Sequence, residues 1–174
     1  MPEPIIFVIT VIGDDRPGLV GELAAVVSQH NGNWLESSMA NLAGKFAGIV
    51  KLAVPASHAE PLRSALNGLV GLTLTIAVSA RPSAAGGRRL KLSLIGHDRI
   101  GIVREVSQVL ARHAVNVEEL ATHVSSAPMS AEALFHAQAQ LTAPADLDRN
   151  VLTAELERLS NDLMVDISMD ETIS

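Results

Sequence analysis

The segment IGDDRPGLVGELAAVVSQHNGNW, residues 12–34, returns later in the chain as IGHDRIGIVREVSQVLARHAVNV, residues 95–117. Both segments carry an Asp-Arg-x-Gly turn between an apolar run and a helix-like pattern. Identity this dense at one constant offset indicates an internal repeat, so two copies of one small fold are predicted. The recurring pairs are Ile12 and Ile95, Gly13 and Gly96, Asp15 and Asp98, Arg16 and Arg99, Gly18 and Gly101, Val20 and Val103, Glu22 and Glu105, Val26 and Val109, His30 and His113, Asn33 and Asn116, and Glu36 and Glu119.

The composition argues against direct binding of nucleic acids. The chain of 174 residues has three Phe, one Trp and no Tyr, whereas single-stranded nucleic acids are bound largely by stacking on aromatic side chains. The net charge of −6 also opposes a surface that binds phosphates. With 48% apolar residues, the chain has ample material for folded cores.

Cysteine is absent, which excludes disulfides, thiolate metal sites and a cysteine nucleophile. The histidines lack the close spacing typical of metal ligands and no cofactor-binding motif is found, so neither a metal nor a cofactor is expected. No apolar run reaches the ~18 residues that a membrane span needs, and no basic segment typical of a signal peptide follows Met1. We therefore expect a cytoplasmic protein without membrane contact.

The apolar pattern along each half predicts the order strand, helix, strand, strand, helix, strand. In the first half, the continuous β-branched run 5–12 is typical of a central strand, and the period changes to that of a helix after Pro17. The second half repeats this order. A small-residue linker, 82–87, is predicted to join a domain 1–81 to a domain 88–174.

Each half is therefore expected to be a ferredoxin-like βαββαβ unit of the α+β class, with two helices on one face of a four-stranded antiparallel sheet. The second copy holds extra residues in SSAPMSAE, 125–132, which predict a mobile loop. Residues 5–12 are apolar toward both faces of their sheet, but no element of the same half is left to cover the second face. The other half or another copy of the chain is expected to cover it, which favours a homo-oligomer.

A tandem βαββαβ arrangement with Asp-Arg-x-Gly between the first strand and the first helix, and Asn just after that helix, resembles a pair of ACT domains. Within that family the chain most resembles the two-ACT glycine cleavage system transcriptional repressors, over almost its whole length. The resemblance implies a non-catalytic regulator that senses a small amino acid, such as glycine, between ACT units. It further implies action through protein–protein contacts on a DNA-binding partner, which would regulate transcription of the glycine cleavage system.

The resemblance also implies which residues hold the ligand. In the family, the ligand lies against the first strand-to-helix loop and the residue that opens the second strand. Ile100 stands where the first copy has Pro17, which predicts a less rigid second loop. Carried onto this sequence, the ligand-binding residues are Asp15, Arg16, Pro17, Gly18, Leu19 and Asn33 in the first copy, and Asp98, Arg99, Ile100, Gly101, Ile102 and Asn116 in the second.

The chemistry of the turns supports an amino-acid site on its own terms. Gly18 and Gly101 let the backbone approach a ligand closely, and the start of the following helix favours a carboxylate. Asp15 or Asp98 can accept hydrogen bonds from an ammonium group. The alternative is that these aspartates cap their helices. The arginine of each turn either clamps a carboxylate or forms a surface or interdomain ion pair.

No catalytic motif is found, neither G-x-S-x-G, a P-loop nor G-x-G-x-x-G, so no enzymatic activity is expected. A function of another class stays open beside the amino-acid sensor, namely a ligand-free ACT interaction module that binds and regulates a metabolic enzyme. A response to an amino acid separates the two hypotheses. An undescribed enzyme is a third hypothesis, and it would require turnover that is abolished by changing one Asp.

Overall fold

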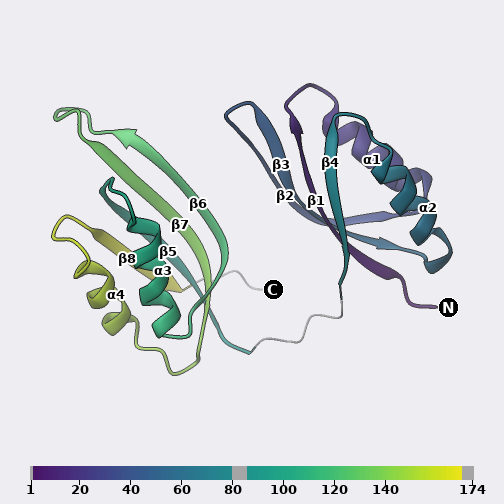
Figure 1. Ribbon diagram of the computed structural model, residues 1–174. Helices are drawn as coiled ribbons and strands as arrows, with labels where there is room; N and C mark the ends of the chain where they lie inside the picture. Colours follow the sequence, from purple (N-terminus) through teal and green to yellow (C-terminus); the bar gives the residue numbers. More distant parts are fainter. Residues whose placement is uncertain (1, 80–85, 170–174) are drawn as a thin grey trace. The chain divides into compact units, whose positions relative to one another are not determined.

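The structure is a computed structural model that describes residues 2–79 and 86–169 (Figure 1). The chain divides into two compact units, Met1–Ser83 (unit 1) and Ala84–Ser174 (unit 2). The predicted linker 82–87 lies outside the described residues, apart from Gly86 and Gly87.

Unit 1 is a four-stranded antiparallel sheet with the strand order β2-β3-β1-β4 and two helices on one of its faces (Figure 1). The central strands β1 and β3 pair along their whole length, from Ile5 opposite Val54 to Asp14 opposite Lys45. Its elements are β1 (Ile5–Asp14), α1 (Leu19–Gln29), β2 (Asn33–Leu42), β3 (Lys45–Val54), α2 (Ala56–Asn67) and β4 (Leu72–Val78).

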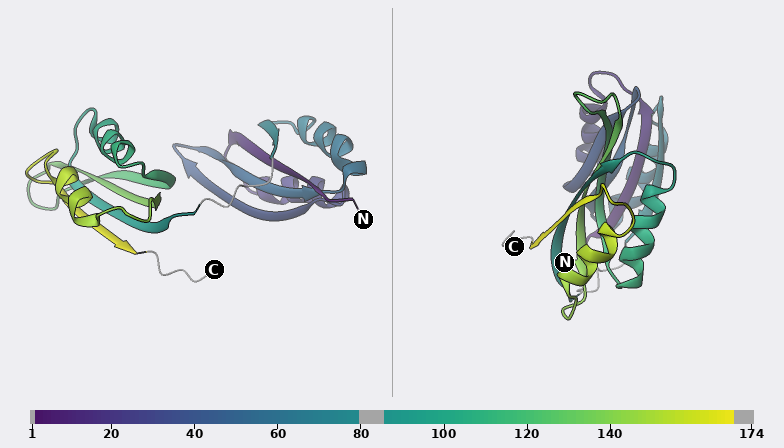
Figure 2. Two further views of the ribbon diagram at one scale, coloured as in Figure 1. Left: turned by 90° about the horizontal axis from the view of Figure 1, so that it is seen from below. Right: turned by 90° about the vertical axis from the view of Figure 1, so that its left-hand side faces the viewer.

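Unit 2 repeats this topology with the strand order β6-β7-β5-β8. Its two helices lie side by side on one face of the sheet (Figure 2). The predicted α+β fold, with ferredoxin-like βαββαβ units, is therefore confirmed in both halves. The elements of unit 2 are β5 (Arg88–His97), α3 (Ile102–Arg112), β6 (Asn116–Ser126), β7 (Ala133–Ala143), α4 (Arg149–Glu157) and β8 (Met164–Met169).

Each core lies between the sheet and its helices because strand side chains alternate between the two faces. In unit 1 the buried side of β1 carries Phe7, Ile9 and Val11, which contact Leu62 and Leu66 of α2 in one cluster. Burying each such side chain contributes about 1.5–3 kcal/mol to folding. Unit 2 has the same construction, and its buried helix residues are Val109, Leu110, Leu152 and Leu156.

The opposite sheet face differs between the units. In unit 1 it carries aliphatic side chains beside polar ones: Ile12 and Ile49 are 47% and 53% exposed there, and Thr10 and Lys51 lie on the same face. In unit 2 the matching strands β6 and β7 place polar side chains on that face, among them His123 and His136, whose parallel rings lie 4.4 Å apart. The prediction that residues 5–12 are apolar toward both faces concerned unit 1 alone, and there Ile6, Val8 and Ile12 lie on the outer face with Thr10.

The loop predicted over 125–132 is shorter in the structure. Ser125 pairs with Leu134 and Ser126 pairs with Ala133, so the hairpin between β6 and β7 extends into the predicted loop and the connection comprises 127–132. The prediction was wrong at these serines because short polar side chains fit an edge strand once a partner strand satisfies their backbone.

Candidate functional site

The first strand-to-helix loop of each unit has glycine at the same special position. Gly18 precedes α1 and Gly101 precedes α3, each with a left-handed backbone at a φ of 91°. A Cβ at either position would meet no heavy atom within 4 Å, so the backbone conformation and not crowding favours glycine. Neither helix start receives a hydrogen bond from a side-chain cap. In α3 the first N–H group, that of Ile102, donates to the Arg99 carbonyl. The other N–H groups in the first turns of α1 and α3 are available to an acceptor from solution.

The aspartates of the turns are not helix caps. Asp15 donates its backbone N–H to the Gly44 carbonyl at 3.0 Å, and its carboxylate accepts a hydrogen bond from Asn41. Asp98 donates its backbone N–H to the Ala133 carbonyl at 2.9 Å. Within the described residues, its exposed carboxylate has no hydrogen-bond partner. The capping alternative is wrong because the glycines hold the cap positions.

Each arginine of the turns is tied to a glutamate in the first turn of the following helix. Arg16 donates to both carboxylate oxygens of Glu22, at 2.9 and 2.7 Å. Arg99 donates to a single carboxylate oxygen of Glu105 and also to the Leu159 carbonyl, the latter at 3.4 Å. The arginine hydrogen bond is the main reason that the pKa of each glutamate is lowered. The arginines thus form ion pairs, and the pairs lie within one unit rather than between domains.

The remaining loop residues divide into exposed and buried positions. Pro17 and Ile100 are exposed, Ile100 completely. Leu19 and Ile102 are only 5% and 4% exposed, and their side chains belong to the cores. The backbone N–H of Leu19 is left to contact a ligand, whereas that of Ile102 donates to the Arg99 carbonyl at 3.4 Å.

Gly13 and Gly96, just before the turns, are glycines because the residues at the start of the neighbouring strand, β4 or β8, lie close to them. A Cβ on Gly13 would lie 2.5 Å from the Gly71 carbonyl oxygen, and one on Gly96 would lie 2.6 Å from a methyl group of Leu163. Both distances are far below van der Waals contact. Packing within the unit accounts for both glycines.

In unit 2, sequence reasoning missed a polar cluster that is hydrogen-bonded to the backbone just before the turn. Asp162 accepts hydrogen bonds from Ser160 and, at 2.6 Å, from the backbone N–H of His97. The hydrogen bond from Ser160 is the main cause, and the bond from the His97 N–H the second, of the lowering of the Asp162 pKa to about 2. The His97 ring lies between two carboxylates, 2.9 Å from Asp162 and 2.8 Å from Glu132. Residues 132 and 162 are far from the repeated motif in sequence, so no local pattern pointed to them.

Asn33 and Asn116 lie away from the loops with which they were grouped. In unit 1 the loop is joined to Gly44, just before β3, whereas Asn33 pairs with Ala53 at the other end of that strand. At ~3.3 Å per residue, the two ends of β3 are about 30 Å apart. Unit 2 has the same separation, because Asp98 is joined to Ala133 and Asn116 pairs with Thr142. One unit therefore does not bring the loop and its asparagine together.

Residues 5–79 match a family model described as the ACT domain. Unit 2 repeats the strand order and the Asp-Arg-x-Gly turn of this matched unit. Unit 1 is an ACT domain, and unit 2 has the same ACT-like fold, so the chain carries two ACT-like units in tandem.

Two solved structures are similar to this tandem ACT protein over nearly its whole length. One is an unknown protein from Galdieria sulphuraria, with 29% identity over 97% of this chain and 99% of that chain, and a TM-score of 0.85. The other is a candidate glycine cleavage system transcriptional repressor, with 17% identity over 95% of this chain and 98% of that chain, and a TM-score of 0.69. No curated protein sequence matches the chain.

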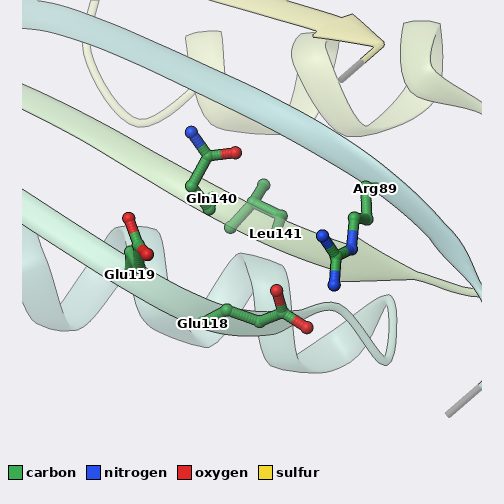
Figure 3. Close-up of a pocket in the computed structure, with 5 residues that line it drawn as sticks. All are labelled: Arg89, Glu118, Glu119, Gln140 and Leu141. Atoms are coloured by element: carbon green, nitrogen blue, oxygen red, sulfur yellow. The ribbon is translucent and has the colours of Figure 1, made fainter. Parts of the chain in front are cut away.

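A polar hollow lies beside the asparagine of the second ACT unit (Figure 3). Arg89 of β5, Glu118 and Glu119 of β6, and Gln140 of β7 surround it. The corresponding positions of the first ACT unit, read from the strand registers, are Ile6, Leu35, Glu36 and Lys51. At two of these four positions a charged residue replaces an aliphatic one, Arg89 for Ile6 and Glu118 for Leu35, and this change between the copies is the sequence signal that marks this end of the sheet.

Over residues 2–79 and 86–169, no three His, Cys, Asp or Glu side chains are grouped closely enough to hold a metal ion. Within the same ranges, every helix of the tandem ACT protein is too short or too polar to cross a membrane.

Proposed function

We propose that this tandem ACT protein is a non-catalytic regulator that senses a small amino acid, glycine being the first to test. It transmits binding through protein–protein contacts and regulates transcription of the glycine cleavage system by docking on a DNA-binding partner. The likeness to the candidate repressor of that system supports the proposal at the level of fold. The proposed location is the cytoplasm.

The observation that carries the proposal is the helix start at the turn. In both units a left-handed glycine, Gly18 or Gly101, opens the helix, and no side chain caps it. The N–H groups and the positive end of the helix dipole attract a carboxylate. The same uncapped construction occurs twice in one chain, at the loop where the ACT resemblance places the ligand.

The aspartates suggest that the two units bind the ammonium group differently. Asp98 has an exposed carboxylate without a partner in the described chain, and it can accept hydrogen bonds from an ammonium group at once. Asp15 must first release Asn41. We therefore place the tighter amino-acid site at the turn of unit 2, with the Arg99–Glu105 pair holding the turn in shape.

A site that also includes an asparagine such as Asn116 requires a second ACT unit, because the loop and the asparagine lie at opposite ends of each sheet. Ligand binding would then stabilise the association of ACT units, since a ligand shifts an equilibrium toward the state that it binds better. That second unit belongs either to the same chain or to another copy, and our proposal includes the second arrangement, a homo-oligomer. The exposed aliphatic side chains Ile12 and Ile49 provide a surface for protein contact.

Thermal unfolding in the presence of each of the twenty amino acids tests the proposal. A ligand at about 100 times its Kd adds roughly 2.7 kcal/mol to the stability of the unit that binds it. For a unit of this size, that raises the midpoint by at least about 10 °C. Asp98→Ala should abolish most of the shift, and Asp15→Ala should reduce it less. Asp146→Ala, at an exposed position away from the turns, is the matched control and should leave the shift unchanged.

If no amino acid shifts the midpoint, amino-acid sensing is refuted. The remaining hypothesis is then the ligand-free module that binds a metabolic enzyme. Co-purification of one enzyme in stoichiometric amount would then support that second function. Tight sequence-specific binding of DNA by the isolated protein would refute the docking part of the proposal.

A further inference from the structure

The polar hollow of unit 2 is built around a β-bulge near the start of β6 and has a volume of about 170 Å³ (Figure 3). The register of β6 and β7 shifts between Val117 and Glu119, so Glu118 is an extra residue that is not paired with β7. A bulge interrupts the regular alternation of side chains along a strand. Two successive carboxylates thereby line one hollow, whereas regular alternation would place them on opposite faces of the sheet.

The hollow has a cationic side on β5 and an anionic side on β6. Arg89 lies on β5, opposite Thr142 of the intervening strand β7. Thr142 donates a hydrogen bond to Glu118 and so holds this carboxylate on the same face of the sheet as Arg89. Gln140, the next residue of β7 on that face, pairs with Glu119 of β6. The amide of Gln140 thus belongs to the strand between the two charged sides (Figure 3).

The opposite charges around the hollow do not form an ion pair with one another. Among the residues that the structure describes, neither Arg89 nor Glu119 takes part in a hydrogen bond or a salt bridge. Glu118 uses one carboxylate oxygen for Thr142, and its other oxygen has no partner in the described chain. A molecule that carries both an anionic and a cationic group satisfies both sides of the hollow at once.

Unit 1 has the same bulge without the same charges. Its register shifts at the corresponding place, where Leu35 is the extra residue. Leu35 stands where unit 2 has Glu118, and Ile6 stands where unit 2 has Arg89. The bulge therefore belongs to the shared fold, whereas the facing charges are specific to unit 2. Opposite charges introduced on two different strands are what the recognition of a doubly charged ligand requires.

We propose that this hollow binds a small zwitterion, a molecule with one carboxylate and one ammonium group. The carboxylate lies against Arg89, whose planar guanidinium donates two parallel hydrogen bonds to such a group. The ammonium group lies against Glu118 and Glu119, and the side-chain oxygen of Gln140 accepts a further hydrogen bond from it. The volume suits this class of ligand, because an engineered cavity of about 150 Å³ accommodates benzene, a molecule of roughly six non-hydrogen atoms.

This site goes beyond the proposed function and is separate from the amino-acid site at the turn of unit 2. Asp98 is joined to Ala133 at the start of β7, whereas the hollow lies around Gln140, near the end of that strand. At ~3.3 Å per residue, the two places are about 23 Å apart. A small ligand therefore does not contact both within one unit, and a variant of one site serves as a control for the other.

Titration of the full chain with γ-aminobutyrate, followed by NMR of its N–H groups, tests the proposal. We expect saturable shifts of the Gln140 side-chain amide and of the Arg89 Nε–H. The backbone signal of Lys51, which has the place of Gln140 in unit 1, should stay unchanged. Butyrate and butylamine each carry only one of the two charged groups. Each should bind at least ~tenfold more weakly, because it leaves one side of the hollow unpaired.

Two variants remove one charge each at exposed strand positions, with little change in side-chain size. Arg89→Gln should weaken the binding of γ-aminobutyrate at least ~tenfold, and Glu119→Gln should weaken it severalfold because Glu118 remains. Arg149→Gln is the matched control, since Arg149 is also exposed but begins α4, on the helix-covered face of the sheet. Its affinity should equal that of the parent. Asp98→Ala, which alters the turn, should also leave this affinity unchanged, so failure of either site is distinguishable from failure of the other.

A parallel titration with glycine, whose two charged groups are on one carbon, identifies the spacing of charges that the hollow recognises. The zwitterion that binds more tightly indicates whether the natural ligand carries its charges on one carbon or on a longer chain. The proposal is overturned if neither zwitterion gives saturable shifts at Arg89 and Gln140, or if butyrate or butylamine binds as tightly as both. It is also overturned if Arg89→Gln or Glu119→Gln retains the affinity of the parent.

Discussion

Replacing Gly18 with Ala should destabilise unit 1, whereas the same replacement at Gly21, three positions later, should stabilise it. A Cβ at either position meets no heavy atom within 4 Å, so crowding contributes to neither effect. Gly18 has a φ of 91°, where a residue with a Cβ costs roughly 1–2 kcal/mol. Gly21 lies inside α1, where alanine is better than glycine by about 0.5–1 kcal/mol. The two variants should therefore differ by roughly 1.5–3 kcal/mol.

Urea unfolding followed by the fluorescence of Trp34 measures this difference. Trp34 is the only tryptophan and packs against the core of unit 1, so its signal reports on that unit. With a slope of about 1–2 kcal/mol per molar urea, the midpoints of the two variants should differ by roughly 0.8–3 M. Gly18→Asn should lose less stability than Gly18→Ala, because asparagine tolerates the left-handed conformation better. A neutral or stabilising Gly18→Ala would refute the left-handed turn and the uncapped helix start built on it.

Three further predictions concern the packing and the charges. Leu62→Ala, at a completely buried position, should cost about 2–5 kcal/mol in unfolding followed by Trp34, whereas Val70→Ala, at an 88% exposed position, should change stability by no more than about 0.5 kcal/mol. The folded-state pKa of Asp162 is about 2, lowered from 3.8, so its contribution to stability is present above pH 3.8 and is lost as the pH falls toward 2. The stability difference between the parent and Asp162→Asn should accordingly shrink over that interval, in unfolding curves measured by circular dichroism, and a difference that is constant with pH would contradict the assignment. Arg16→Gln should return the pKa of Glu22 upward toward 4.5, as measured by NMR titration of its carboxyl group, while the urea midpoint changes little because the pair is exposed.

The fold could be predicted from the sequence because its signals are local and occur twice. The apolar run ending at Ile12, the helical stripe after Pro17 and the same pattern after Ile95 define strand and helix without any tertiary information. The hairpin beyond Ser125 could not be predicted, since its two polar serines become strand only through pairing with the neighbouring strand. Local propensity does not contain that pairing.

The candidate site could be predicted only in part. The turn itself was visible as a repeated motif, but the partner of each arginine was overlooked, although Arg16 and Glu22 recur together in the second copy. The separation of Asn33 from its loop follows from the sheet register, which the motif does not encode. Asp162 was unpredictable because it reaches the turn only when β8 is in place beside β5.

The exchange of Met39 and Gly48 in one unit for Thr122 and Ala137 in the other constrains how the duplicated halves could have diverged. A Cβ at Gly48 would lie 2.3 Å from the backbone oxygen of Ser38 and 2.7 Å from both Cα and Cγ of Met39, so the backbone of β2 as well as the methionine side chain excludes a methyl group there. Residues in contact do not act additively, so the effect of changing one of them depends on which residue its partner is. A single substitution at one of these positions therefore acts differently in the two halves, and each half retains its own combination, Met39 with Gly48 or Thr122 with Ala137.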